Sequence, residues 1–348
     1  MPPPVAGKLL ACAWHGMANY TGFPLIDLHP SPADLAAVVL AGLARCPKQL
    51  PAWLLYNSEG SALFDQICLQ PEYTLTSTEL ELLHKHAAKL CKYLPAGGLV
   101  LEFGAGSAEK VGPLLDVLAD PAYLAIDINA NHLQTAGARL QACYPHVPML
   151  GICADFSGSF DLANLNVSDL DEKQLHLSDL FSRPRLGFFP GSSLGNFEPE
   201  EAIGFLRQLR QLLGPKGLLL IGIDQPKQRA LLEAAYNDAA GVSAAFASNL
   251  LLRLQRDLKA ELNPAGFSYL AQWQEKEQRI AMALVSREPQ RMLLLGEEIF
   301  FAAGEQLITE YSYKYSPEAF QNLAARAGWQ GLERCCDATD GYSLHLLG

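Results

Sequence analysis

The sequence predicts an α/β fold in which a mostly parallel, doubly wound sheet carries helices on both faces. Two observations carry this prediction. Between residues 99 and 224, short apolar runs alternate with segments of helical spacing. The first run ends in a glycine turn, LEFGAGSAEK, typical of the junction between a buried strand and a helix. After Asp224 the rhythm changes, which indicates a second α+β part.

Composition limits the classes of function. The chain has 348 residues, 49% of them hydrophobic, and 26 basic against 37 acidic residues give a net charge of −11. This balance argues against nucleic acid or an anionic membrane surface as partner. No apolar run reaches the ~18 residues of a membrane span, and the first residues are too weakly apolar for a signal peptide. The eight cysteines form no C-x-x-C pair. We therefore expect a cytoplasmic monomer without a metal.

Three helices are expected before the first strand of the sheet. Ser31 as N-cap and Pro32 at the first position predict a helix to about residue 45. A short helix should lie between the prolines at 51 and 71. Thr76 and Glu79 form a capping box that predicts a third helix, which runs to about residue 93.

The alternating region predicts strands and helices in turn. The strands are Leu99–Phe103, Tyr123–Asp127, Pro148–Cys153, Leu186–Pro190 and Leu218–Asp224, and the helices are Ala108–Leu118, Ala130–Ala142 and Pro199–Leu213. An acidic stretch, Leu162–Asp179, interrupts them and is interpreted as a solvated face. Ligands of such a sheet bind at the carboxyl ends of its strands.

The rest of the chain divides between the sheet and a second unit. Helices are expected at Lys227–Ala239 and Ser243–Leu258, followed by antiparallel strands up to about residue 315. A helix at Pro317–Ala327 and strands near 332–336 and 342–347 complete the chain. An antiparallel hairpin that closes a parallel sheet is typical of the seven-stranded, Rossmann-like class I methyltransferase core. We assign residues 78–226 and 315–348 to this core, and residues 1–77 and 227–314 to a discontinuous α+β substrate domain.

The glycine turn distinguishes between two ligand classes. Gly104 and Gly106 allow the backbone to approach a ligand closely. A dinucleotide site requires a third glycine where this chain has Glu109, and a carboxylate there disfavours pyrophosphate. Glu102, just before the turn, suits a cationic ligand. The turn therefore favours S-adenosylmethionine, which carries a sulfonium and an ammonium group, over NAD; a turn without a ligand is the alternative.

Four further residues stand where ligand groups are expected. Asp127 ends the second strand, where an acidic residue binds ribose hydroxyls. Asp155 and Phe156 end the third strand and suit an adenine ring. Asn196, in the loop GSSLGNF after the fourth strand, offers an uncharged acceptor and donor that suit an amine. For each of these residues, an ordinary capping or turn role is the alternative.

These motifs bring out a family resemblance. The chain resembles the histidine Nα-methyltransferases of ergothioneine biosynthesis from about residue 50 onwards. The shared segments are LLYNSEGSALFDQI, PEY, EFGAGSAEK, AIDINA, ADF, PGSSLGNFEPEEA, AAYNDAAGV, FAAGE and TEYSYKY. The resemblance implies S-adenosylmethionine-dependent trimethylation of L-histidine to hercynine, with a small amino acid as the partner molecule.

The resemblance also implies roles for individual residues. Cofactor-binding positions are Gly104, Lys110, Asp127, Asp155 and Phe156, beside Glu102 and Gly106 from the turn itself. Tyr73, Asn196 and Tyr236 match positions that hold the substrate carboxylate and amine, and Tyr56 lies beside the amine. Glu310 and Ser312 match the imidazole site, with Met282 near the same pocket. Tyr56 and Asn196 are the catalytic candidates, whereas Tyr56, Tyr73 and Met282 by themselves also fit ordinary core positions.

Two departures from the family bear on the substrate. Thr74–Ser77 replace the usual tyrosine–proline–threonine–arginine after PEY, and Tyr311 replaces a small aliphatic residue. The alternatives are therefore N-methylation of another amino acid, such as tryptophan or tyrosine, or a non-catalytic protein that binds S-adenosylmethionine. Retention of Glu310 and Ser312 favours histidine, because an indole has no second nitrogen to bind.

Overall fold

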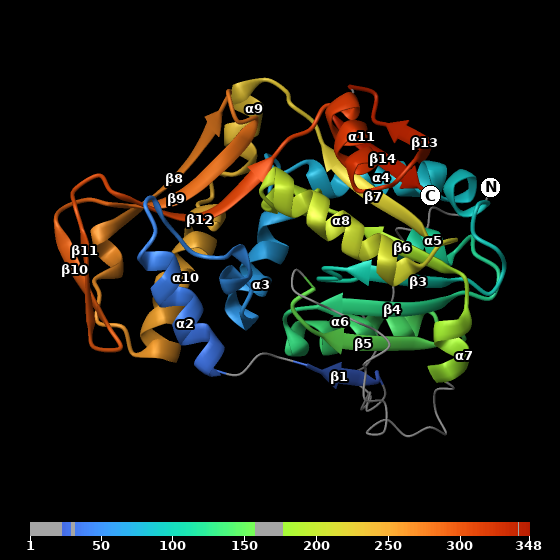
Figure 1. Ribbon diagram of the computed structural model, residues 1–348, viewed down its shortest axis with the longest axis horizontal. Coiled ribbons are helices and arrows are strands. Elements are labelled where there is room, and N and C mark those ends of the chain that lie inside the picture. Colours follow the sequence, from blue (N-terminus) through green and yellow to red (C-terminus); the bar gives the residue numbers. More distant parts are fainter. Residues whose placement is uncertain (1–22, 29–31, 157–176, 340) are drawn as a thin grey trace.

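A large sheet dominates one half of the molecule. The computed structural model describes residues 23–28, 32–156, 177–339 and 341–348 (Figure 1). Its largest sheet has the strand order β1-β5-β4-β3-β6-β7-β14-β13. The strands are β1 (Leu25–Asp27), β3 (Leu99–Phe103), β4 (Ala122–Asp127), β5 (Met149–Cys153), β6 (Arg185–Phe189), β7 (Leu218–Asp224), β13 (Gly331–Cys336) and β14 (Tyr342–Leu347).

The strand order reverses direction next to β3, the strand that carries the glycine turn. From β1 to β7 all neighbours pair in parallel, whereas β14 is antiparallel to both β7 and β13. The doubly wound sheet and its closing hairpin are as predicted. The sheet has eight strands instead of the expected seven, because β1 adds to the edge at β5. The short β1 was not predicted, because three residues are too few to show the alternating hydrophobic pattern of a strand. It belongs to the segment, residues 1–77, that we assigned to the substrate domain.

Helices cover both faces of this sheet because consecutive strand residues point to opposite sides. On one face Val100 and Tyr123 pack with α4 (Leu75–Cys91) and α6 (Ala130–Cys143). On the other face Leu99 and Leu101 pack with α8 (Pro199–Leu213) and α11 (Pro317–Arg326). The continuous apolar strands are thus buried on both sides, as expected of a parallel sheet.

Two local predictions are wrong. The helix expected at Ala108–Leu118 shrinks to α5 (Gly112–Leu115), because Ala108 adopts a left-handed conformation with φ 55°. The capping box of Thr76 and Glu79 does not form: α4 begins at Leu75, and Glu79 is fully buried within it. The expected N-cap Ser31 and most of the acidic stretch Leu162–Asp179 lie outside the described residues; α7 (Leu177–Ser182) ends that stretch.

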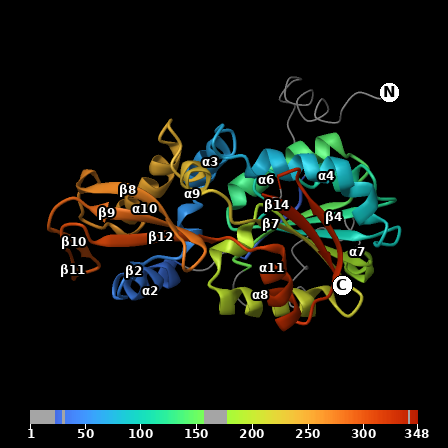
Figure 2. The same cartoon turned by 90° about the horizontal axis from the view of Figure 1, so that it is seen from above.

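A smaller sheet forms the other half of the molecule (Figure 2). Its order is β2-β12-β9-β8, with antiparallel pairing between β12, β9 and β8. The strands are β2 (Lys48–Gln49), β8 (Phe267–Gln274), β9 (Arg279–Ser286) and β12 (Gln306–Tyr313), with a separate hairpin of β10 (Gln290–Leu294) and β11 (Glu297–Phe301). Its helices are α2 (Pro32–Leu43), η1 (Ala52–Leu55), α3 (Ser58–Ile67), α9 (Arg229–Ala235) and α10 (Val242–Leu258).

The two halves meet where a functional site is expected. In Figure 1 the carboxyl ends of β3 and β4 point toward the smaller sheet. Strand β12 contacts the short helix η4 (Ser193–Asn196), which follows β6 of the large sheet. Within the described ranges, no helix is long and apolar enough to cross a membrane.

Candidate active site

Two adjoining cavities lie between the sheets. The larger has a volume of about 690 Å³, within the usual range for small-molecule sites. The smaller has a volume of about 50 Å³ and lies against β12, α9 and α10. Both are lined by Tyr56, Phe64, Ser193, Asn196 and Glu310. The two cavities therefore adjoin, and these residues form the wall that they share.

The glycine turn and the ends of β4 and β5 form one side of the larger cavity. Gly104 (φ +72°) and Gly106 (φ +51°) have left-handed backbones. A Cβ at Gly104 would lie 3.6 Å from the Phe156 ring, so the glycine leaves a cradle beside that ring. Asp127 accepts hydrogen bonds from the amides of Gly106 (2.9 Å) and Asn129 (3.0 Å). Burial raises the pKa of Asp127, and these donors offset part of that rise.

An aromatic wall faces the turn. The Phe156 ring packs edge-on against Phe103 and Phe189, at centroid distances of 6.2 and 5.9 Å. Phe205 of α8 completes this cluster, and Asp155 lines the cavity next to Phe156. The wall can accept a flat apolar ring, with the Asp155 carboxylate at its edge.

The structure places Glu102 and Lys110 outside the lining of both cavities. Glu102 is buried in β3 and accepts a 2.6 Å hydrogen bond from the Tyr123 hydroxyl. Lys110 forms a 2.8 Å ion pair with Glu79, which also accepts a hydrogen bond from the Gly191 amide (2.8 Å). Glu79 thus connects the turn, through Lys110, to the loop after β6, through Gly191. The predicted capping box did not anticipate this role.

Glu102 should make stability depend on pH. Burial raises its pKa from 4.5 to about 8, although the Tyr123 hydrogen bond and Lys110 oppose that shift. The folded state therefore holds this proton more tightly than the unfolded state. Its contribution is complete below pH 4.5 and is lost as pH rises through about 8. We expect Glu102→Gln to reduce the fall in unfolding free energy between pH 6 and 9 by about 2–4 kcal/mol.

Urea denaturation at both pH values measures this effect. Glu109→Gln, at an exposed position of the same turn, is the matched control and should behave as wild type. An equal pH dependence in wild type and Glu102→Gln would contradict the assignment of the shift to Glu102.

The loop after β6 positions Asn196. Gly191 (φ +78°) and Ser192 (φ 57°) have left-handed conformations, and the Ser192 hydroxyl accepts a hydrogen bond from the Asp224 amide (3.0 Å). Gly195 packs directly against β12, where an added Cβ would lie 2.6 Å from the Tyr313 carbonyl oxygen. This close approach brings Asn196 Nδ2 within 2.7 Å of Glu310 Oε1, to which it donates a hydrogen bond.

Glu310 lies at the centre of the shared wall. It is 7% exposed, and the Tyr56 hydroxyl lies 3.5 Å from the same carboxylate oxygen. Burial raises the pKa of Glu310 to about 8, against the opposing effects of Tyr56 and Lys314. Met282 on β9 is its direct partner in the strand register. Burial also raises the pKa of Tyr56 well above 10, so that its phenol stays protonated.

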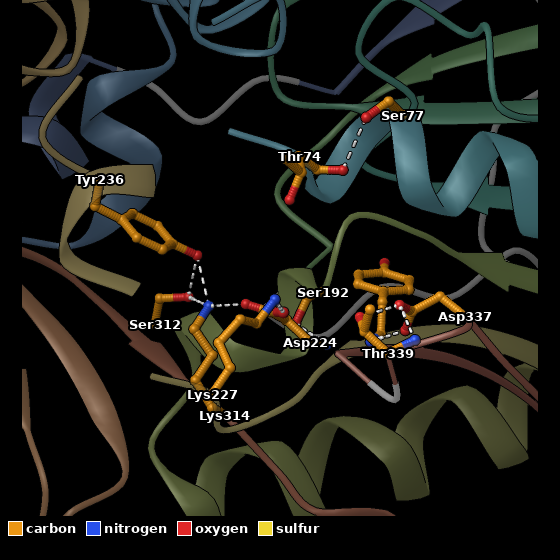
Figure 3. A network of polar contacts seen from close by, with 11 residues as sticks. Thr74, Ser77, Ser192, Asp224, Lys227, Tyr236, Ser312, Lys314, Asp337 and Thr339 are labelled. Atoms are coloured by element: carbon orange, nitrogen blue, oxygen red, sulfur yellow. Dashed lines mark hydrogen bonds and ion pairs between the residues drawn. The ribbon is translucent and has the colours of Figure 1, made fainter. Parts of the chain in front are cut away.

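A second polar group lies at the other end of the smaller cavity. The Tyr236 and Ser312 hydroxyl oxygens are 2.9 Å apart, and both accept hydrogen bonds from the Lys314 ammonium (Figure 3). The Tyr73 ring packs edge-on against Tyr236 at 5.9 Å. The smaller cavity is thus lined by all the residues predicted to bind substrate: Tyr56, Tyr73, Asn196, Tyr236, Met282, Glu310 and Ser312.

Sequence reasoning missed Lys314 and its partner Asp224. A period-2 signal was present, because Glu310, Ser312 and Lys314 alternate along one face of a strand. Asp224 ends β7 in the same way that Asp127 ends β4. The described part of the chain contains no group of three or more His, Cys, Asp or Glu side chains suited to a metal ion.

Comparison with known proteins gives consistent matches. A model of the family described as "Histidine-specific methyltransferase, SAM-dependent" matches residues 35–348. A histidine N-alpha-methyltransferase of Mycolicibacterium smegmatis is 37% identical over 325 residues, which cover 90% of this chain and 96% of that protein. Its counterpart in Mycobacterium tuberculosis is 33% identical, over 88% of this chain and 92% of that protein. Ergothioneine biosynthesis protein 1 of Neurospora crassa is 30% identical, over 86% of this chain and 33% of that protein.

Proposed function

The chain belongs to the family of S-adenosylmethionine-dependent, histidine-specific methyltransferases, and from this premise we propose that it trimethylates the α-amino group of L-histidine. The product would be hercynine, the first intermediate of ergothioneine biosynthesis. Membership of the family confirms the predicted methyltransferase class, the Rossmann-like core and the use of S-adenosylmethionine. The number of methyl groups and the individual residue roles are part of the proposal.

One observation carries the proposal most strongly. Asn196 and Glu310 come from the two halves of the molecule, yet their side chains meet at 2.7 Å on the wall shared by both cavities. A small molecule in the smaller cavity can therefore contact both side chains while its amine faces the larger cavity. Had the two residues lined separate cavities, no amino acid could bridge them.

The larger cavity fits S-adenosylmethionine. Its volume, the Gly104 cradle beside the Phe156 ring and the buried Asp127 carboxylate suit a nucleoside with two ribose hydroxyls. The absence of a third glycine fits a ligand without phosphate. When bound, S-adenosylmethionine supplies a methyl group already activated on a positively charged sulfur. The protein then needs mainly to hold the amine in position.

Asn196 and Tyr56 suit an amine that must be methylated repeatedly. Both are uncharged at neutral pH, since the pKa of Tyr56 is raised and the amide does not titrate. Neither residue forms a salt bridge with an amine, so the amine nitrogen can rotate between successive methylation steps. Holding the nitrogen close to the methyl donor contributes most of the rate enhancement in such orientation-controlled reactions.

Glu310 and Ser312 suit the imidazole ring. Their side chains lie two residues apart on one face of β12, and both line the smaller cavity. A ring nitrogen that donates to Glu310 leaves its second nitrogen for the hydroxyl pair. An indole or phenol leaves one of these buried groups unpaired, which costs about 1–3 kcal/mol. The free-energy cost of this unpaired group favours histidine over tryptophan or tyrosine.

Asp127→Ala should weaken cofactor binding. Loss of the carboxylate removes hydrogen bonds to ribose and releases the Gly106 amide, so the dissociation constant for S-adenosylmethionine should rise about 10–100-fold. Titration calorimetry measures this directly. Asp127→Asn retains one oxygen acceptor and should show an intermediate loss. Unchanged affinity in Asp127→Ala would move the ribose contact elsewhere.

Mass spectrometry of the product tests the proposal as a whole. The enzyme is incubated with S-adenosylmethionine and one amino acid at a time from a full panel. We expect L-histidine alone to gain three methyl units. Turnover of tryptophan or tyrosine instead would establish the rival substrate, whereas cofactor binding without methylation of any amino acid would favour a regulatory protein.

A further inference from the structure

A fully buried ammonium group lies behind Tyr236 and Ser312, two residues that line the smaller cavity. Lys314 follows β12 and is 2% exposed. Its Nζ lies 2.7 Å from Asp224 Oδ2, 2.6 Å from the Tyr236 hydroxyl and 2.9 Å from Ser312 Oγ (Figure 3). The other oxygen of Asp224 pairs with Lys227 at 2.7 Å. No role in the reaction described so far requires this lysine.

The hydrogen-bond pattern fixes what the two hydroxyls can offer. An ammonium group has three N–H donors, and the three oxygens around Lys314 Nζ use all of them. Both hydroxyls therefore accept from Lys314. Tyr236 and Ser312 also lie 2.9 Å apart, so one of them donates to the other. One hydroxyl proton remains, and it is available to the cavity.

The Lys314 ammonium group lies directly behind this proton. Burial is the largest single effect and lowers the pKa of Lys314, but the Asp224 carboxylate and the Tyr236 hydroxyl together raise that pKa above its ordinary value, so the amine stays protonated. Glu310, in the same lining, offers a carboxyl oxygen as acceptor. The cavity lining thus carries both a donor and an acceptor.

We propose that Lys314 is a positioning residue that makes this cavity select histidine with a neutral imidazole ring. The inference rests on the proposed function and deepens it. A neutral ring has one N–H, which donates to Glu310, and one bare nitrogen, which accepts a hydrogen bond from the free hydroxyl proton of the Tyr236–Ser312 pair. Lys314 directs that proton toward the cavity because it donates to both hydroxyl oxygens. A protonated ring has an N–H on both nitrogens. One of them would face a hydroxyl proton with an ammonium behind it, so the protonated ring is excluded.

Several titratable groups line the smaller cavity or lie directly behind its lining, on the elements packed around it. They are Asp224 and Lys227 at the end of β7, Tyr236 at the end of α9, Tyr56 after η1, Tyr73 before α4, Tyr269 on β8, and Glu310 and Lys314 themselves. The pKa of Glu310, about 8, is close to that of an imidazole ring. A pH profile of histidine affinity alone would therefore not distinguish the titration of Glu310 from the titration of the ring. A readout of the ring itself separates them.

Nitrogen-15 spectroscopy of ring-labelled L-histidine provides that readout. The label is bound to the full-length protein in the presence of S-adenosylhomocysteine at pH 6, where the free ring is mostly protonated because its pKa is about 6.5. We expect one protonated and one bare ring nitrogen in the bound state. Two protonated nitrogens would overturn the inference but leave the proposed function intact. Absence of bound histidine would contradict the proposed function and, with it, this inference.

Two matched variants distinguish the effect of the Lys314 hydrogen bonds to the hydroxyls from the effect of removing any cation beside Asp224. Lys314→Met removes all three donors, whereas Lys227→Met removes the other cation on Asp224 without touching either hydroxyl. We expect Lys314→Met to weaken histidine binding at least tenfold, or to admit the protonated ring, with unchanged affinity for S-adenosylhomocysteine. Lys227→Met should keep the neutral ring and wild-type affinity. Equal effects in both variants would overturn the role of Lys314. If Lys314→Met does not fold, the wild-type spectrum decides.

Discussion

Glu310→Ala is expected to raise the KM for L-histidine at least about 100-fold while the affinity for S-adenosylmethionine changes less than about threefold. The carboxylate is the only acidic side chain that lines the smaller cavity within the described residues. Without it, a buried ring N–H has no acceptor. Asn196 also loses its hydrogen-bond partner. A lost hydrogen bond and an unpaired buried donor together account for about 3 kcal/mol, which corresponds to this factor.

Steady-state kinetics with histidine and tryptophan measure the effect and its specificity. Glu310→Gln retains the volume and one acceptor oxygen and should recover most of the loss. Tryptophan, if it reacts at all, should be affected less than histidine, because truncation opens space for the larger ring. An unchanged KM for histidine in Glu310→Ala would refute the imidazole contact.

Asn196→Ala should act on turnover rather than on binding. Its amide comes from the loop of the large sheet and points at the wall between the two cavities, where the reacting nitrogen must lie. Loss of this contact leaves the amine free to turn away from the larger cavity. A misplacement of about 1 Å costs about 100-fold, so we expect kcat to fall 100- to 1,000-fold with KM changed less than tenfold.

Asn196→Asp separates orientation from simple loss of volume. It keeps the size and an acceptor oxygen but loses the donor to Glu310 and brings two carboxyl groups to hydrogen-bond distance. Kinetics should show a slower enzyme whose activity recovers as pH falls, since one carboxyl group must be protonated. Equal kcat values for wild type and Asn196→Ala would remove Asn196 from the reaction.

Local sequence patterns determined most of the fold. Strands such as Leu99–Phe103 and Leu218–Asp224 have the predicted limits because a fully buried strand is an apolar run that ends at a turn. The alternation of strands and helices predicted the parallel, doubly wound sheet, but not its strand order. The short strand β1 and the shortened helix α5 were not predicted, since three residues carry no period and the left-handed Ala108 has no signature.

The candidate site depended on contacts across long stretches of chain. Tyr56, Tyr236 and Glu310 lie far apart in the sequence, and spacing alone could not bring them together; the family resemblance did. The pairing of Lys314 with Asp224 was missed for the same reason. A lysine at the end of an apolar strand is usually solvated, whereas Lys314 is buried in contact with Asp224 at the end of β7 and Tyr236 after α9.

The account depends most on one amino acid being held at both ends within the smaller cavity. A crystal structure of the enzyme with L-histidine and S-adenosylhomocysteine tests this directly. We predict that the imidazole lies between Glu310 and Ser312, and that the α-nitrogen lies beside Asn196 and Tyr56 and faces the sulfur with no side chain between them. Histidine bound outside this cavity, or with its α-nitrogen turned toward Lys314, would contradict the account.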